Sequence, residues 1–288
     1  MNAEVFALLS AMVWAVDSIL VRFGARHSNV AAAAFLSYVL TAVCFWTYLF
    51  VHSSLELLAL PSTLYFILSG CFQPLLARML YYVGIARLGV SRAGPLIGTV
   101  PVFAVLLAVA FLGERPNLWI YGGTLFTVAS VWLISTRRPG EAEWRVFDVI
   151  FPLAAAFFAA VGQNLRKAGL LILPNPVVAA AVGTSTSLVL FFVFLLSRGT
   201  LHLVKIHKRS LPYFGPAAFA SATAQLLSFV ALAAGEVSTV VPLLNMIPLF
   251  TVLFSVLFLR EVEKVNLRVV LGTVLMVAGA VVIIKRQG

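Results

Sequence analysis

Two stretches of the chain decide its fold: Val90–Glu114, VSRAGPLIGTVPVFAVLLAVAFLGE, and Val237–Glu261, VSTVVPLLNMIPLFTVLFSVLFLRE. Laid on one another without a gap, they are identical at 12 of 25 positions, including two prolines and the final glutamate. Apolar composition alone supplies some matches of Leu and Val, but it does not bring two prolines and a glutamate into register. The two stretches are therefore copies of one structural unit.

The repeat extends beyond these two stretches. With two extra residues in the second copy, Gly123-Thr124 falls on Gly272-Thr273. Near the start of the chain, at a shift of 145 positions, Gly24 falls on Gly169. The repeated unit therefore includes segments on both sides of the quoted stretch.

The composition of the chain places it in a lipid bilayer. Of its 288 residues, 62% are hydrophobic and 10% are charged, whereas about a quarter of the residues of a soluble domain are charged. A water-soluble fold of this size cannot hide so much apolar surface. The net charge of +10 comes mostly from Lys and Arg in short breaks between apolar runs. We therefore expect a multi-pass protein of the cell membrane that does not bind nucleic acid.

A helix needs about 20 mostly apolar residues to cross the hydrocarbon. Ten segments fit this pattern: Val5–Val21, Val30–Val51, Thr63–Val83, Ala93–Leu112, Trp119–Ser135, Val146–Leu165, Val177–Leu196, Tyr213–Ala233, Val237–Leu259 and Val269–Ile284. The predicted fold class is an all-α integral membrane protein with ten transmembrane helices. Residues 1–138 form the first five-helix repeat and residues 145–288 the second. Because five is odd, the second repeat enters the membrane from the opposite side, which is the inverted arrangement of alternating-access transporters.

These residues resemble the drug/metabolite transporter superfamily, in particular its EamA-type ten-helix transporters. The resemblance rests on the two Pro-x5-Pro helices that end in Phe-Leu-x-Glu, the Gly-Thr helices that follow them, and the Trp14 helix with its basic end at Arg22. It implies a secondary transporter, exporter or exchanger, of a small organic solute such as an amino acid or an anionic metabolite. It also implies a central cavity lined mainly by helices 1, 3, 4, 6, 8 and 9. An alternative is a flippase or transporter of a phosphate-linked lipid.

Charged side chains inside the predicted helices are the first candidates for a substrate site, because an ionisable group in hydrocarbon is costly. Asp17 is either a proton-coupling carboxylate or the buried partner of an arginine. Arg78 and Arg92 each present a guanidinium fork that suits a carboxylate or phosphate. Alternatively, Arg78 pairs with Asp17, and Arg92 extends to the membrane interface. Tyr81 lies three residues after Arg78 and is expected on the same helix face.

The remaining predicted substrate-binding residues are uncharged side chains within helices: Trp14, Gln163, Asn164, Gln225, Ser228 and Asn245. The polar members of this set can equally form hydrogen bonds between neighbouring helices. Four repeated prolines are predicted to bend helices 4 and 9: Pro95, Pro101, Pro242 and Pro248. Glu114 is predicted to be structural, paired with Arg115.

The sequence indicates no catalytic residues, no metal site and no cofactor. The four histidines lie in or beside connections, and the two cysteines lie within apolar runs without metal spacing. We therefore expect that the chain is not an enzyme. The expected partners are a small-molecule substrate, the lipid bilayer and a proton as coupling ion, and the expected state is a monomer or weak homodimer.

Overall fold

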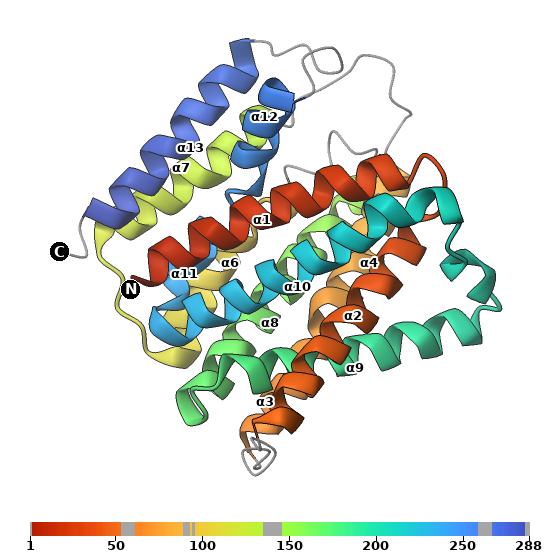
Figure 1. Cartoon of the computed structure of the whole chain (residues 1–288). Helices are drawn as coiled ribbons and strands as arrows, with labels where there is room; N and C mark the ends of the chain where they lie inside the picture. Colours follow the sequence, from red (N-terminus) through yellow and green to blue (C-terminus); the bar gives the residue numbers. More distant parts are fainter. Residues whose placement is uncertain are drawn as a thin grey trace. The chain divides into compact units, whose positions relative to one another are not determined.

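A computed structural model describes the chain over residues 2–52, 61–88, 93, 96–134, 146–258 and 267–285 (Figure 1). Within these ranges the regular structure is entirely helical. Six of the described helices are long and apolar enough to cross a membrane, and four further apolar helices are shorter. Each of the ten predicted segments overlaps one of these apolar helices. The membrane class and the helical fold are therefore confirmed, while the number of crossings stays a prediction.

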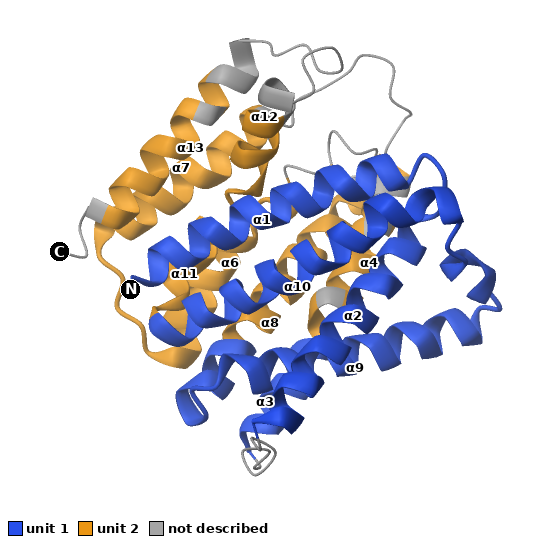
Figure 2. Ribbon diagram, viewed as in Figure 1, with its two compact units in different colours: residues 1–71, 165–234 blue, residues 72–164, 235–288 orange. Residues whose placement is uncertain are grey.

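The chain divides into two compact units, which are coloured separately in Figure 2. Unit 1 consists of residues 1–71 and 165–234, and unit 2 of residues 72–164 and 235–288. Each unit takes residues from both sequence repeats, so this division differs from the division into repeats. The long helix α8 (Ile150–Ile172) contributes to both units.

Unit 1 is built from long apolar helices, which Figure 1 shows together with their labels. They are α1 (Ala3–Gly24), α2 (Val30–Val51), α3 (Ser62–Gly70), the end of α8, α9 (Pro176–Ser197) and α10 (Leu211–Ala234), with the short turns η5 (Leu201–Val204) and η6 (Lys208–Ser210). α1 packs along α10, and α2 packs against both α9 and α10. Asn29 and Asn175 cap α2 and α9, because each side-chain oxygen accepts a hydrogen bond from a first-turn amide.

Two glycines at equivalent repeat positions each make room for an aromatic ring in unit 1. A Cβ atom on Gly24 would lie 2.3 Å from a ring carbon of Phe214, and a Cβ atom on Gly169 would lie 2.4 Å from a ring carbon of Phe66. Both rings are fully buried. No residue larger than glycine fits these positions without displacing a ring, so the matched glycines mark one packing contact that both repeats use.

Unit 2 holds shorter helices and the first part of α8. Its other elements are η2 (Cys71–Leu76, from residue 72), α4 (Ala77–Leu88), α6 (Val100–Leu107), η3 (Ala108–Leu112), α7 (Leu118–Ile134), η4 (Val146–Val149), α11 (Val237–Leu244), α12 (Ile247–Phe258) and α13 (Leu267–Lys285). α7 packs along α13, and α6 packs against α11 (Figure 1).

The repeated prolines interrupt the segments that were predicted as single bent helices. Pro101 is the second residue of α6 and Pro248 the second residue of α12, and each helix follows a two-residue turn. A proline suits the first turn of a helix, where its missing N–H is not needed. The turns lie at Gly98-Thr99 and Asn245-Met246, which are equivalent positions of the repeat. Pro242 lies inside α11, and Pro95 falls outside the described residues.

Glu114 serves a structural role, but its partners differ from the prediction. η3 ends at Leu112, and the next residue, Gly113, has a φ of 69°. The Glu114 carboxylate then accepts hydrogen bonds from the backbone amides of Val237 at 2.7 Å and Ser238 at 2.9 Å. These are the first two residues of α11, and the Glu114 side chain is buried. The carboxylate therefore caps a helix N-terminus, where amide groups and the helix dipole favour negative charge. The predicted pairing with Arg115 was wrong because α11 offers two unsatisfied donors in a buried position.

Replacing Glu114 by glutamine is expected to destabilise the fold, because the amide has one acceptor atom where the carboxylate has two, and it lacks the negative charge that favours the helix N-terminus. We expect the free energy of unfolding to fall by about 1–2 kcal/mol, measured for the purified chain in detergent. The matched control Arg115→Gln removes the neighbouring exposed charge and should change the stability by less than about 0.5 kcal/mol. Equal losses in the two variants would contradict the capping role.

Candidate functional site

The predicted site residues are distributed over both units. Trp14 and Asp17 lie on α1 of unit 1, and Gln225 and Ser228 lie on α10, against which α1 packs. Unit 2 contains the other described members: Arg78, Tyr81, Gln163, Asn164 and Asn245. Arg92 lies outside the described residues.

In unit 1, Ser228 forms hydrogen bonds that join α1 to α10. The hydroxyl of Ser10 donates to the carbonyl oxygen of Ala224 at 2.7 Å, and the hydroxyls of Ser10 and Ser228 lie 2.7 Å apart. Ser10 is fully buried and Ser228 nearly so. Hydrogen bonding between helices was the alternative to substrate binding for the predicted polar residues. Because the Ser228 hydroxyl is used in this way, it has little remaining capacity to hydrogen-bond a solute.

Gln225 is also held by a neighbouring helix. Its Nε2 atom donates a hydrogen bond to the hydroxyl of Thr184 on α9. Trp14 and Asp17 on α1 are half-buried.

Sequence reasoning missed two buried cations in unit 1. Arg166 and Lys167 were expected in a connection, because the sixth helix was predicted to end at Leu165, but α8 continues to Ile172. Each side chain is only 9% exposed. Lys167 Nζ donates to the carbonyl oxygen of Leu232 at 3.0 Å, near the end of α10, where carbonyl groups lack helical partners.

The other cation, Arg166, lies over an aromatic ring. Its guanidinium carbon is 4.9 Å from the ring centroid of Phe229 on α10, a distance at which the ring face attracts a cation. The signal that could have revealed both residues is the apolar run from 168 to 172, which continues the helix pattern beyond the charged pair.

In unit 2, Arg78 and Tyr81 lie in the first half of α4 and are half-buried. Five residues before Arg78, the helical path is interrupted at Gln73, which has an extended backbone with φ −133° and ψ 125°. Gln73 precedes Pro74, and a residue before proline is sterically driven toward this conformation. The prediction of kinks from repeated prolines overlooked Pro74 because it is not part of the repeat.

Gln163 and Asn164 lie side by side in the sequence of α8 and are each 7% exposed. The Nδ2 atom of Asn164 donates to the carbonyl oxygens of Ala104 at 3.2 Å and Ala160 at 3.0 Å. Within the described ranges, Gln163 Oε1 and Asn164 Oδ1 have no hydrogen-bond partner. A buried acceptor without a donor is unfavourable, so these oxygens are suited to a ligand or an ordered water.

Asn245 forms the turn between α11 and α12, and its Nδ2 donates to the carbonyl oxygen of Val241 at 2.8 Å. The same carbonyl also accepts the backbone amide of Asn245 at 3.1 Å, so the side chain adds a second hydrogen bond to the end of α11. Its repeat mate is Gly98, which occupies the equivalent turn. The two residue types share a tolerance for tight turns.

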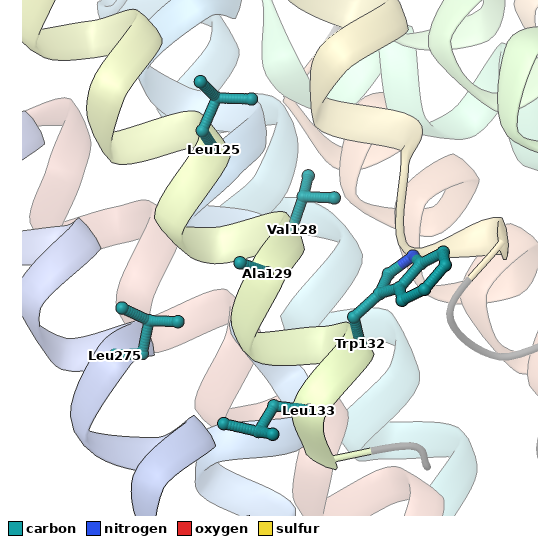
Figure 3. Close-up of a pocket in the computed structure, with 6 residues that line it drawn as sticks. All are labelled: Leu125, Val128, Ala129, Trp132, Leu133 and Leu275. Atoms are coloured by element: carbon teal, nitrogen blue, oxygen red, sulfur yellow. The ribbon is translucent and has the colours of Figure 1, made fainter.

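The pocket shown in Figure 3 is an open apolar groove of about 660 Å³ on α7 and α13. It is lined by Leu125, Val128, Ala129, Trp132, Leu133 and Leu275. Leu125 is 61% exposed and Trp132 52%. The groove offers a polar solute almost no hydrogen-bonding groups, so we do not regard it as the site. In the part of the chain that the structure describes, no group of three His, Cys, Asp or Glu residues is placed to hold a metal ion.

Comparison with known proteins identifies the class of the molecule. The profile of the EamA-like transporter family matches residues 1–136 and again residues 147–285. One solved structure, described only as "Crystal structure of protein", has a TM-score of 0.76 over 99% of this chain and 97% of that chain. Its sequence identity of 16% supports a shared fold alone. No curated protein matches the chain. Two family matches that together cover nearly every residue show that this chain belongs to the EamA-like transporter family, whose members are membrane transporters of small solutes.

Proposed function

We propose that the chain is a secondary transporter, either an exporter or an exchanger, of a small organic solute such as an amino acid or an anionic metabolite. It works in the cell membrane by alternating access, with its two repeats in inverted orientation. The observation that carries this proposal is the match of one transporter family to two successive halves of the chain. Two copies of one unit, each with an odd number of crossings, supply the symmetry that alternating access uses.

The interrupted helices support this mechanism. Turns at Gly98-Thr99 and Asn245-Met246 break both copies of the same repeat segment. Transporters commonly build substrate sites from such discontinuous helices, because the interruptions expose helix ends and backbone groups within the membrane. The same positions in both repeats suit a mechanism in which each half performs the same movement in turn.

Arg78 is the residue that we propose to recognise an anionic group of the solute. Its guanidinium offers a planar fork of donors, and it follows the interruption at Gln73 by five residues, near the start of a helix. A helix start adds a favourable field for negative charge. The repeat mate of Arg78 is Gln225, so the repeated fold does not itself require a charge at this position.

A flux assay with the purified chain in proteoliposomes tests the transport function. The panel consists of amino acids, phosphorylated metabolites and labelled lipids on a phosphate-linked carrier. Uptake or exchange of a water-soluble solute supports the proposal. Movement of the lipids alone would establish the flippase alternative, and no flux of either kind would oppose both.

We expect Arg78→Gln to reduce transport of an anionic solute by about 10-fold or more, because a charge-assisted hydrogen bond contributes about 1.5–3 kcal/mol. Arg78→Lys should recover only part of the activity, since the fork geometry is lost. The measurement is initial flux in proteoliposomes. The control Arg87→Gln makes the same change on the same helix, at a half-exposed arginine that pairs with Asp148 at 3.0 Å, and it should transport normally. Unaltered flux in Arg78→Gln would end the proposed role.

Asp17 is proposed to carry the coupling proton. Asp17→Asn should abolish accumulation of solute against its gradient, because the amide cannot bind and release a proton. Counterflow exchange of labelled for unlabelled solute should persist, since exchange needs no net proton movement. Asp148→Asn serves as the matched control and should retain both activities. Loss of exchange together with accumulation, at normal protein yield, would show that Asp17 instead supports binding or folding.

A further inference from the structure

The interruption at Gln73 belongs to only one of the two repeats. The alignment that lays Val90 on Val237 is a shift of 147 positions, and at this shift Gln73 and Pro74 fall on Ala220 and Ser221, within the uninterrupted helix α10. The repeated architecture is therefore compatible with a continuous helix at this position. Local departures from regular structure that the fold does not require concentrate at functional sites.

Gln73 packs directly on α8, one residue before the two buried amides. A Cβ atom on Gly162 would lie 2.8 Å from Gln73 Cβ and 3.5 Å from Gln73 Oε1. Only glycine allows this approach, and it brings the glutamine against the helix that carries Gln163 and Asn164. The neighbouring rings of Phe72 and Phe158 stack with centroids 5.6 Å apart, which fastens the interrupted segment to the same part of α8.

In the described part of unit 2, Gln163 and Asn164 each leave a hydrogen-bond acceptor without a partner. The two partners of Asn164 Nδ2 are carbonyl oxygens, which only an amide N–H can serve, so the orientation of the amide is settled and Oδ1 is the atom left over. Gln163 Oε1 likewise has no partner among the described residues. Both side chains are more than nine-tenths buried. An anion would be repelled by these oxygens, whereas a hydrogen-bond donor would satisfy them, and one that carries positive charge would be held more strongly than a neutral one.

We propose that Gln163, together with Gln73 where it packs on the neighbouring Gly162, forms a binding site for a compact monovalent cationic centre. Backbone carbonyl oxygens of unwound membrane helices hold sodium ions in other transporters. Side-chain amide oxygens are neutral acceptors of the same kind, and they can also accept the N–H bonds of an alkylammonium group. The centre is therefore either a sodium ion or the primary ammonium of a transported solute. This inference deepens the proposed transport function, but binding can be measured where no transport takes place.

The test is the thermal unfolding of the purified full chain in detergent, titrated with sodium chloride or methylammonium chloride. Choline chloride holds the ionic strength constant, because its quaternary nitrogen is bulky and has no N–H. A ligand of the native state raises the Tm with a saturable dependence on its concentration. A rise with sodium alone assigns an ion site, a rise with methylammonium alone assigns the solute's ammonium, and a rise with both assigns a site open to either.

Variants locate the binding at the amides. Gln163→Leu keeps the bulk but removes the acceptor, so the concentration for the half-maximal shift should rise by about 10-fold or more. Gln163→Glu places a carboxylate there and should lower that concentration, which also covers the case in which the leucine variant does not fold. Thr223→Val removes an exposed hydroxyl that bonds only within its own helix, and it should titrate like the original chain.

Two results would overturn the proposal: no rise in Tm above choline with either cation, or an equal rise in Gln163→Leu. A chain that binds a cation in detergent but moves no solute in proteoliposomes would oppose the transport function while leaving the site intact. A chain that moves solute but binds neither cation would oppose the cation site while leaving the transport function intact. The two failures are therefore distinguishable.

Discussion

Hydrocarbon offers no hydrogen-bonding partners, so a chain in a bilayer must satisfy its backbone amides and carbonyls internally. Every interruption of a helix then leaves backbone amides or carbonyls without helical partners, and another group has to form hydrogen bonds with them. Glu114 accepts hydrogen bonds from two backbone amides at the start of α11. Lys167 donates one to a carbonyl oxygen near the end of α10. Both charges match the helix dipole at the end they contact. These contacts with helix ends explain why Glu114 and Lys167 are buried although only 10% of the residues in the chain are charged.

The same constraint separates two kinds of polar side chain. Ser10 with Ser228 and Gln225 with Thr184 satisfy one another across helix contacts in unit 1. Such bonds contribute only about 0.6 kcal/mol each in membrane bundles, so their effect is to select which helices pack together. The amide oxygens of Gln163 and Asn164 in unit 2 satisfy nothing within the described chain. Buried polar groups of the first kind explain the packing, and those of the second kind point to a ligand.

Comparison of the two repeats distinguishes features of the fold from features of this transporter. The turns before Pro101 and Pro248, and the glycines that accommodate Phe66 and Phe214, occur in both repeats. Asp17, Gln73 and Arg78 do not, because their mates are Gly162, Ala220 and Gln225. A feature that one repeat lacks is not needed to build the repeated unit. The unrepeated residues are therefore the natural place for specificity within a family whose shared fold does not determine the solute.

The sequence by itself determined the membrane class, the position of the apolar helices and the two-copy organisation. These follow from long-range patterns of hydrophobicity and identity that do not depend on which helices touch. It could not reveal that Glu114 caps α11 or that Lys167 lies inside α8 and reaches α10, because both contacts join residues far apart in the chain. It also placed Gln163 and Asn164 among many polar residues without ranking them. Only the tertiary structure singled out these two amides, because whether a buried amide has a hydrogen-bond partner depends on the neighbouring helices and not on its own segment.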